Sequence, residues 1–295
     1  MLRRIYDRLL SPNQRARVKY AYYAAQKTVA DRFFAYDMEQ LKKALMQLGI
    51  SRGDTLFVHS SFKTFNGFQG GPQDVIDCLV EILGEGGNLL MPSMQYRSSS
   101  FEHLQRNELF DVRKTYSQMG LITEVFRRKK GVLRSLHPTH SVLAWGKDAA
   151  RIVQDHEKCL YPCGNQSPFD KFRSMNGKVL FFDVPFNTFT FIHYIEDLIK
   201  NKLPFPLYMK EPMAVDMLDG DGRRITVSTY VFSHDAVKRR RPAILKKHLL
   251  RKNMIRRVKI GKTALMLVAA EDAIQCTQAM LADKIYFYGG TGVHA

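Results

Sequence analysis

The chain has 295 residues, of which 45% are apolar, so it can bury the core of one large domain or of two closely packed ones. No apolar run approaches the roughly 18 residues that a membrane-spanning helix needs. The first residues carry charges where a signal peptide would carry its apolar stretch, so a cytoplasmic protein is expected. Four scattered cysteines cannot form a disulfide framework, and reduced thiols are expected.

The charge is strongly positive, because 45 Lys and Arg residues stand against 28 Asp and Glu residues, a net charge of +17. An excess of this size attracts anions and repels polycations. Residues 238–259 contain eleven Lys or Arg residues and no acid, and residues 1–36 form a second basic region. The cluster at 238–259 is either a binding surface for phosphate or a solvated helix face.

The chain begins with a segment that predicts basic amphipathic helices over residues 1–34, interrupted at Ser11-Pro12, because proline suits a first helical turn and not a helix interior. We take residues 1–36 as an extension of a main domain that covers residues 37–295. From Asp37 onward, apolar residues recur every three or four positions and stop at Gly49, which predicts a core-facing helix.

Strands and helices then alternate along the chain. A strand at 55–58, a helix at 72–83 and a strand at 88–91 form a unit of the kind that builds parallel sheets. The later elements of this alternation are a helix at 117–128, a strand at 141–145, a helix at 148–155, a strand at 178–183, a helix that carries His193, a strand at 263–269 and a helix to 282.

The segment 214–232 predicts a hairpin, since Asp219-Gly220-Asp221-Gly222 lies between two runs rich in strand-forming residues. The sequence therefore predicts an α/β fold. We expect a mixed, largely parallel central sheet flanked by helices, with an added antiparallel hairpin region and the basic N-terminal helical extension.

His193 and Glu196 lie three residues apart in a predicted helix, so their side chains fall on adjoining faces of its first turn. A carboxylate there can orient an imidazole and raise its basicity, as a general base needs in order to take a proton from an amine. Thr190 is a candidate cap for this helix. On spacing alone, a structural or surface pair is the commoner use of such residues.

Two other segments carry polar side chains beside predicted strands. His59-Ser60-Ser61 follows a buried strand at the sheet edge where open α/β folds bind ligands, and Gly70-Gly71 precedes a helix, which suits close approach to a phosphate or pantetheine chain. An ordinary polar connection is the alternative. Residues 134–141 bring a cation, hydroxyls and two imidazoles together, but no third zinc ligand has a recognisable spacing, so no metal site is expected.

The sequence contains no Walker loop, no dinucleotide-binding glycine motif and no nucleophile elbow, which disfavours nucleotide hydrolysis, hydride transfer and esterase chemistry. Seven segments instead run in a familiar order, and in them the chain resembles the aminoglycoside 3-N-acetyltransferase family over roughly residues 40–200. These segments are GDTLFVHSSF, the GG before the first crossover helix, GGNLLMPSM, MGLITEVFR, RSLHPTHSVLAWG, GNQSPFDKF and GKVLFFDVPFNTFTFIHYIED.

The resemblance implies an acetyl-CoA-dependent N-acetyltransferase that needs no metal. It implies that His193 is the catalytic base, supported by Glu196, and that the amine attacks directly in a ternary complex. The residues expected to line the acyl-CoA cleft are His59, Ser60, Ser61, Phe62, Gly70, Gly71, Met91, Pro92, Ser93, Arg134, Ser135 and Ser141. Asp235, Thr190 and Asn187 are the candidates for contact with the acceptor, and residues 205–260, which depart from the family pattern, are taken as a variable acceptor-side insertion.

The charge pattern suggests a different acceptor from the polycations that antibiotic-modifying relatives bind. We expect an anionic amino sugar, linked to a nucleotide or a lipid in polysaccharide biosynthesis, whose phosphates would meet the basic cluster at 238–259. An aminoglycoside is the alternative acceptor. A non-catalytic protein that binds nucleic acid or anionic membrane through its basic surface is the alternative of another class, and nucleic acid is the less expected partner.

The basic segment 1–34 has two possible uses that the sequence leaves open. It can dock on acidic lipid, which would make the protein peripheral at the inner membrane face, or it can pack in a homodimer.

Overall fold

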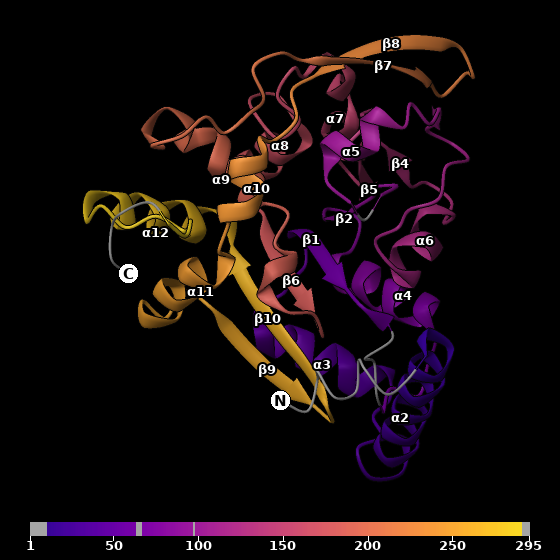
Figure 1. Ribbon diagram of the computed structural model, residues 1–295. Helices are drawn as coiled ribbons and strands as arrows, with labels where there is room; N and C mark the ends of the chain where they lie inside the picture. The colour runs from indigo at the N-terminus through magenta and orange to yellow at the C-terminus, as the bar shows by residue number, and fades with distance from the viewer. Residues whose placement is uncertain (1–10, 63–66, 97, 291–295) are drawn as a thin grey trace.

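The computed structural model describes residues 11–62, 67–96 and 98–290, and Figure 1 shows a central sheet enclosed by helices. The sheet has seven strands in the order β4-β5-β2-β1-β6-β10-β9. Its strands are β1 (Thr55–Ser60), β2 (Asn88–Pro92), β4 (Leu133–Arg134), β5 (Val142–Gly146), β6 (Lys178–Phe182), β9 (Arg256–Ile260) and β10 (Thr263–Ala269).

The sheet is mixed, as predicted. Strand β1 pairs in parallel with β2 on one side and with β6 on the other, whereas β5 runs antiparallel to β2 and β10 runs antiparallel to β6. Strand β4 is antiparallel to β5, and β9 is antiparallel to β10. Within this sheet, β5 and β10 therefore run in one direction and the other five strands run in the opposite one. These pairings confirm the α/β class and bring the ends of β1 and β6 to the same edge.

Alternate residues of β1 enter two different hydrophobic layers, because successive side chains of a strand point to opposite faces. Phe57 packs in the layer formed by α7, α8, α9, α11 and α12, and Leu56 and Val58 pack in the layer formed by α3, α4 and α6. The helices of the first layer are α7 (Ala149–Val153), α8 (Pro168–Ser174), α9 (Ile192–Ile199), α11 (Pro242–Arg251) and α12 (Ala270–Ala282). Those of the second are α3 (Met38–Leu48), α4 (Pro72–Leu83) and α6 (Leu121–Arg127).

Most of the predicted helices are present, and helices α6 and α7 are shorter than expected. Helix α4 has the predicted bounds, with Gly71 before it and Gly84 after it. Helix α6 begins at Leu121 and not at residue 117, because Gly120 has a φ of 122°, which lies outside the helical region. Several elements were not predicted: α5 (Ser100–Gln105), α8, α10 (His234–Arg239), α11, β3 (Phe110–Asp111), β4, β9 and the 3₁₀ turns His156–Lys158, Phe186–Thr188 and Lys200–Lys202.

The predicted hairpin is present and forms a separate small sheet. Strands β7 (Met213–Leu218) and β8 (Arg224–Thr229) pair antiparallel, and β3 adds to β7 in parallel. This three-stranded sheet lies above the body in Figure 1.

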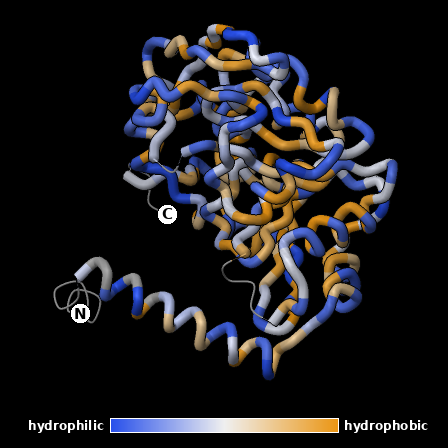
Figure 2. Tube along the Cα trace, turned by 90° about the vertical axis from the view of Figure 1, so that its right-hand side faces the viewer, coloured by the Kyte–Doolittle hydropathy of each residue, from blue (hydrophilic) through white to orange (hydrophobic). Residues whose placement is uncertain are grey.

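The N-terminal helix α2 (Pro12–Phe33) projects away from the body of the molecule (Figure 2). Ser11 caps it, because its hydroxyl accepts from the Gln14 N–H while the Ser11 N–H donates to Oε1 of Gln14, and the helix therefore starts at the proline. Among its described side chains only Ala30 is buried, and the exposed apolar residues include Tyr20 as well as Tyr22, which lie on different faces. The single apolar face of an amphipathic helix is therefore missing from α2, and residues 1–10 of the predicted extension lie outside the described residues.

Two features of the described chain concern its environment. No helix in residues 11–62, 67–96 and 98–290 is long and apolar enough to cross a membrane. All four cysteines are free and buried, and burial raises the pKa of Cys78 to about 12 and that of Cys159 to about 11.

Candidate active site

The candidate site lies where the carboxyl ends of β1 and β6 meet. Residues His59 and Ser60 end β1 opposite Phe181 and Phe182 of β6, and the chain continues from β6 through the turn Phe186–Thr188 into helix α9. His193 is in the first turn of that helix, as predicted. The predicted loop His59-Ser60-Ser61 is thus partly strand, because the ladder between β1 and β6 extends to Ser60.

The predicted pair of His193 and Glu196 is formed. The Nδ1 of His193 lies 2.9 Å from Oε2 of Glu196, whose side chain has no exposure, while 18% of the His193 side chain is exposed. An ionised carboxylate can only accept, so Nδ1 carries the proton and Nε2 carries the lone pair. This is the tautomer that a general base needs.

Two further residues hold the Glu196 carboxylate. Arg240 donates from Nε to Oε1 over 2.6 Å and from Nη2 to Oε2 over 2.9 Å, and the Tyr288 hydroxyl donates to Oε1 over 2.5 Å. Burial alone would raise the pKa of Glu196, but the charge of Arg240 and the hydrogen bonds from His193 and Arg240 hold it at about 2. Glu196 is therefore ionised throughout the physiological pH range.

The net effect on His193 differs from the expectation that its carboxylate partner raises its basicity. Burial and then the charge of Arg240 lower the pKa of His193, and the interactions with Glu196 offset only part of this. Two more buried imidazoles stand beside it: His140, whose ring centre is 5.3 Å away, and His59, whose pKa falls to about 3 through burial and then through His193. All three imidazoles therefore remain neutral at neutral pH.

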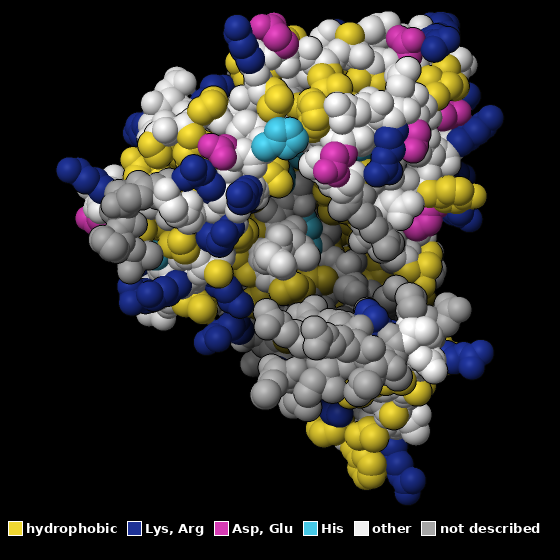
Figure 3. Space-filling view, in the orientation of Figure 1, with side chains coloured by type: hydrophobic (Ala, Val, Ile, Leu, Met, Phe, Trp, Pro, Cys, Tyr) yellow, Lys and Arg dark blue, Asp and Glu magenta, His cyan; other side chains and the backbone are white. Residues whose placement is uncertain are grey.

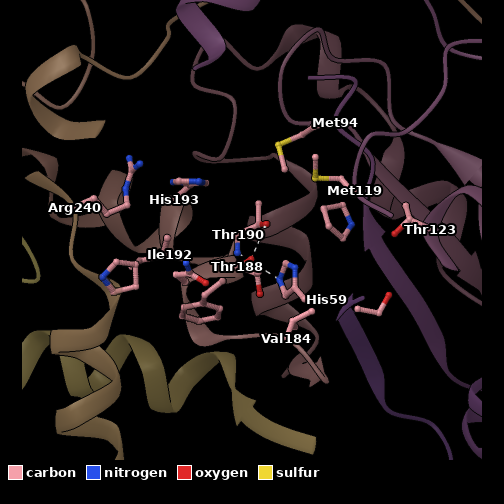
Figure 4. A pocket seen from close by; sticks show the side chains of 15 residues that line it. His59, Met94, Met119, Thr123, Val184, Thr188, Thr190, Ile192, His193 and Arg240 are labelled. Atoms are coloured by element: carbon pink, nitrogen blue, oxygen red, sulfur yellow. Dashed lines mark hydrogen bonds between the residues drawn. The ribbon is translucent and has the colours of Figure 1, made fainter. Parts of the chain in front are cut away.

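Three cavities with shared wall residues lie in this region, two of them lined by His193, and Figure 4 shows the first. Cavity I has a volume of about 320 Å³ and is lined by His59, Ser60, Pro92, Met94, Met119, Thr123, Val184, Asn187, Thr188, Phe189, Thr190, Ile192, His193, Arg240 and Pro242. Cavity II, of about 260 Å³, is lined by Met94, Tyr96, Ser98, Ser99, Ser100, Met119, His140, His193, Phe232, Val237 and Arg240. Cavity III, of about 490 Å³, is lined by Ser60, Ser61, Phe62, Gln118, Met119, Gly120, Leu121, Val184, Pro185 and Thr188.

The cavities share walls at the dyad. His193 and Arg240 line both cavity I and cavity II, together with Met94, and Met119 lines all three cavities. In Figure 4 the His193 ring lies between Arg240 and Met94. A molecule in cavity I and another in cavity II could therefore both reach the same imidazole.

Several predicted site residues come together here. His59, Ser60, Pro92, Asn187 and Thr190 line cavity I with His193, and Ser61 and Phe62 line cavity III. Thr190 does not cap α9, because its hydroxyl donates to the Thr188 carbonyl while its N–H donates to Nε2 of His59 over 3.4 Å.

The remaining residues predicted for the acyl-CoA cleft line none of these cavities in the described part of the chain: Gly70, Gly71, Met91, Ser93, Arg134, Ser135 and Ser141. The side chains of Arg134, Ser135 and Ser141 are hydrogen-bonded inside the protein, whereas the buried Ser93 hydroxyl has no partner among the described residues. The Arg134 guanidinium donates to the carbonyls of Ser93 and Thr115 over 2.7 and 2.6 Å, and the Ser141 hydroxyl donates to the same Ser93 carbonyl. These residues line none of the three cavities, and their assignment to acyl-CoA stays a prediction.

Asp235 is also away from the dyad. It lies in the first turn of α10 with its side chain 57% exposed and 3.6 Å from Arg239. Cavity II receives Val237 from the same helix, so Asp235 is on an element that borders the cavity without lining it. Within the described residues, no group of three His, Cys, Asp or Glu side chains is arranged to hold a metal ion.

Sequence reasoning missed Arg240, Tyr288, Phe232 and the two methionines of the cavity walls. Arg240 is the middle residue of the run Arg239–Arg241, and nothing in that run distinguishes the buried arginine from its neighbours. Its buried position follows from tertiary structure, because the backbone of residues 239–241 pairs with that of residues 287–289.

Comparisons with known proteins identify the family. The model of the family described as aminoglycoside 3-N-acetyltransferase matches residues 57–282. The chain is 28% identical to aminoglycoside N(3)-acetyltransferase III from Salmonella sp, over 66% of this chain and 71% of the relative. It is 29% identical to the SPbeta prophage-derived aminoglycoside N(3')-acetyltransferase-like protein YokD from Bacillus subtilis, over 58% and 68% of the two chains.

Solved structures agree on the fold. Aminoglycoside acetyltransferase AAC(3)-Xa superposes with a TM-score of 0.75 at 22% identity, over 86% of this chain and 95% of that one. The apoenzyme of AAC(3)-IVa gives a TM-score of 0.69 at 25% identity, over 86% and 92% of the chains. AAC-IIIb, solved as a binary complex with CoASH, gives 0.71 at 22% identity, over 85% and 97%.

These matches contradict the expected acceptor, an anionic amino sugar of polysaccharide biosynthesis, and favour the aminoglycoside alternative. The physical reason lies in the basic cluster, whose charge is not gathered at the site. Arg240 is neutralised by Glu196, while Arg239 and Arg241 donate to backbone carbonyls. The other cations are spread over α10, α11 and the edge strand β9.

The family match covers the whole of the central sheet from β1 to β10 except its first two residues, and it includes both members of the dyad. The chain therefore belongs to the aminoglycoside 3-N-acetyltransferase family and is an acyl-CoA-dependent N-acyltransferase with acetyl-CoA as its co-substrate.

Proposed function

We propose that this protein transfers the acetyl group of acetyl-CoA to an amino group of an aminoglycoside, with His193 as the general base. The observation that carries the proposal is the position of His193 in the wall between cavities I and II, with Nδ1 turned to Glu196. This leaves Nε2 as the nitrogen available to reactants in the two cavities.

In this mechanism the thioester lies in cavities I and III and the acceptor amine in cavity II. The amine nitrogen attacks the thioester carbonyl while Nε2 of His193 takes a proton from it. The C–N bond forms, the C–S bond then breaks, and the proton passes from the imidazolium to the leaving thiolate, which gives the amide and free CoA. Asn187, which lines cavity I, is the candidate to stabilise the oxyanion, because the hydroxyl and the N–H of Thr190 already donate to Thr188 and His59.

The acids near the site are at its border. Among the described residues that line the three cavities there is no Asp or Glu. Exposed acids are instead carried by the two helices that contribute to cavity II, Glu102 on α5 and Asp235 on α10. Figure 3 shows acidic side chains beside the hollow on this face of the molecule. We propose that they attract the ammonium groups of the acceptor that do not react.

The test is thiol release from acetyl-CoA across a panel of aminoglycosides and of amino sugars that carry a single amine, with His193→Ala as the control. We expect turnover with the aminoglycosides that depends on His193. Calorimetry with acetyl-CoA is the second measurement. Binding of acetyl-CoA without turnover of any aminoglycoside would contradict the acceptor, and absence of binding would contradict the enzyme itself.

The partner of helix α2 is a separate proposal. Its exposed cations, which include Arg17, Lys27 and Arg32, support contact with acidic lipid, and its exposed aromatic residues support either lipid or a second copy. Sedimentation with anionic and neutral liposomes, with and without residues 1–34, separates these outcomes: lipid contact predicts loss of anionic binding on truncation, and a dimer predicts a change of mass alone.

A further inference from the structure

We infer that Arg240 and Tyr288 are positioning residues, which hold the Glu196 carboxylate ionised and aligned on Nδ1 of His193 so that Nε2 stays unprotonated. The inference rests on the proposed role of His193 as the base. It goes beyond that role, because it assigns a function in the reaction to two side chains that act on His193 through their hydrogen bonds to Glu196.

The hydrogen bonds of Glu196 are divided between its two oxygens in a way that fixes its orientation. Oε2 accepts from both His193 and Arg240, and Oε1 accepts from Arg240 and Tyr288. A planar guanidinium that donates to both oxygens sets the plane of the carboxylate. Rotation of the carboxylate away from Nδ1 would therefore break three other hydrogen bonds at the same time.

The backbone keeps these two residues in register with each other. Arg240 and Tyr288 form a β-bridge, flanked by a hydrogen bond from the Arg241 N–H to the Phe287 carbonyl over 2.8 Å and one from the Gly289 N–H to the Arg239 carbonyl over 2.7 Å. The Arg240 guanidinium also lies 5.0 Å from the ring centre of Phe232. Both donors thus reach Glu196 from backbone segments that are joined directly by hydrogen bonds.

The electrostatic role follows from burial. Glu196 has no exposed side-chain surface, so without a cation its charge would act on His193 with little screening. Arg240 cancels that charge while it leaves the accepting oxygen in place. Glu196 can then orient the imidazole, while burial and the charge of Arg240 outweigh its stabilisation of the protonated form.

Other groups around the dyad act in the same direction or are neutral. His140 and His59 are neutral imidazoles whose charging would oppose that of His193, and Cys163, near both Glu196 and Arg240, is a buried thiol whose pKa is raised by burial. Asp197 follows Glu196 on α9 but is engaged by Lys200 and Tyr208. Arg240 is thus the cation that determines the charge felt by His193 within the described residues packed around it.

The test combines ring ¹⁵N chemical shifts of His193, assigned by difference from His193→Ala, with the pH profile of kcat/KM. In the wild type we expect Nδ1 protonated and Nε2 unprotonated. In Arg240→Met we expect the titration of His193 to move to higher pH, together with the acidic limb of the profile. Arg240→Lys retains the charge without the fork, so its titration should stay near that of the wild type while kcat falls by about tenfold.

The matched control is Arg224→Met, which removes an exposed ion pair with Asp216 on the hairpin and should change neither readout. If Arg240→Met does not fold because Glu196 is left as an unpaired buried charge, the double variant with Glu196→Gln removes both charges, and Tyr288→Phe tests the same alignment with the ion pair intact. An Nε2–H tautomer in the wild type, or an unmoved titration in folded Arg240→Met and Tyr288→Phe, overturns the inference. The chemical shifts need no acceptor, so this outcome is distinct from failure of the proposed acetyl transfer.

Discussion

Arg240 and Glu196, 44 residues apart in the chain, form an ion pair through two hydrogen bonds of 2.6 and 2.9 Å. The pair joins the end of helix α10 to helix α9, the helix that carries His193. A segment that the sequence places in a variable acceptor-side region therefore provides a direct partner of the proposed catalytic dyad. The predictions below depend on this connection.

Removal of the base should abolish most of the activity. We expect His193→Ala to lower kcat by about 10²- to 10⁴-fold, the usual contribution of a general base. The thermal unfolding midpoint should change only as much as is usual when a partly exposed side chain is truncated. Thiol release from acetyl-CoA at saturating acceptor measures kcat. His248→Ala, on helix α11 outside the three cavities, is the control and should retain wild-type turnover.

The pH profile should have its acidic limb below the ordinary histidine value of 6.5. His193 must be neutral to accept a proton, and burial followed by Arg240 lowers its pKa. The value of kcat/KM should therefore stay constant as the pH falls through 6.5 and should decrease only at lower pH. An acidic limb above 6.5 would show that Glu196 raises the pKa of His193 by more than burial and Arg240 lower it, and would contradict this prediction.

Glu196 should also contribute to stability in a defined pH range. Its pKa is about 2 in the folded protein against an ordinary value of 4.5, so its ionised form is favoured by folding. That contribution is fully present above pH 4.5 and is lost as the pH falls towards 2. In Glu196→Gln, the slope of the unfolding midpoint between pH 5 and pH 3 should be smaller than in the wild type, as measured by thermal melts at each pH. Equal slopes would mean that other carboxylates account for the acid sensitivity.

The two sides of the site should separate by mutation. Leu121 lines only cavity III and Val237 lines only cavity II, and both side chains are partly exposed, so a tryptophan can be accommodated without repacking the core. We expect Leu121→Trp to raise the KM for acetyl-CoA by about tenfold, which corresponds to about 1.4 kcal/mol, and to leave the KM for the acceptor unchanged. Val237→Trp should do the reverse. The opposite pattern would exchange the cavities assigned to the two substrates.

Gly146, at the end of β5, should tolerate no side chain. Its φ is 120°, and a Cβ would lie 2.1 Å from the Gly87 carbonyl oxygen and 2.8 Å from Cα of Asn88. Because both contacts are backbone atoms of the neighbouring segment, Gly146→Ala should reduce the free energy of unfolding by about 3 kcal/mol. Denaturant unfolding measures this, and Gly220→Ala, in a turn with open space around it, is the control.

The sequence predicted the layers of this fold because their signals are local. Apolar spacing and glycine ends located α3 and α4, and continuous apolar runs located β1, β2 and β6. The antiparallel direction of β5 and β10 could not be predicted, since a buried strand has the same composition in either direction.

The same distinction holds at the site. His193 and Glu196 are one helical turn apart, so their pairing was predictable, whereas Arg240 and Tyr288 reach Glu196 through a bridge between distant segments. Arg134 and Ser141 were expected to line the acyl-CoA cleft because the resemblance to the family implies it. They satisfy buried carbonyls, a use of polar side chains that a single sequence does not distinguish from binding.

The four buried cysteines have a practical consequence for every variant described above. A thiol is modified through its thiolate, and all four are buried with raised pKa values, so the native protein should be nearly silent to an aromatic disulfide reagent. The colour that develops during turnover then comes from released CoA alone. A variant that has lost its structure would show up to four additional reactive thiols before any substrate is added, so one reagent distinguishes a disabled enzyme from an unfolded one.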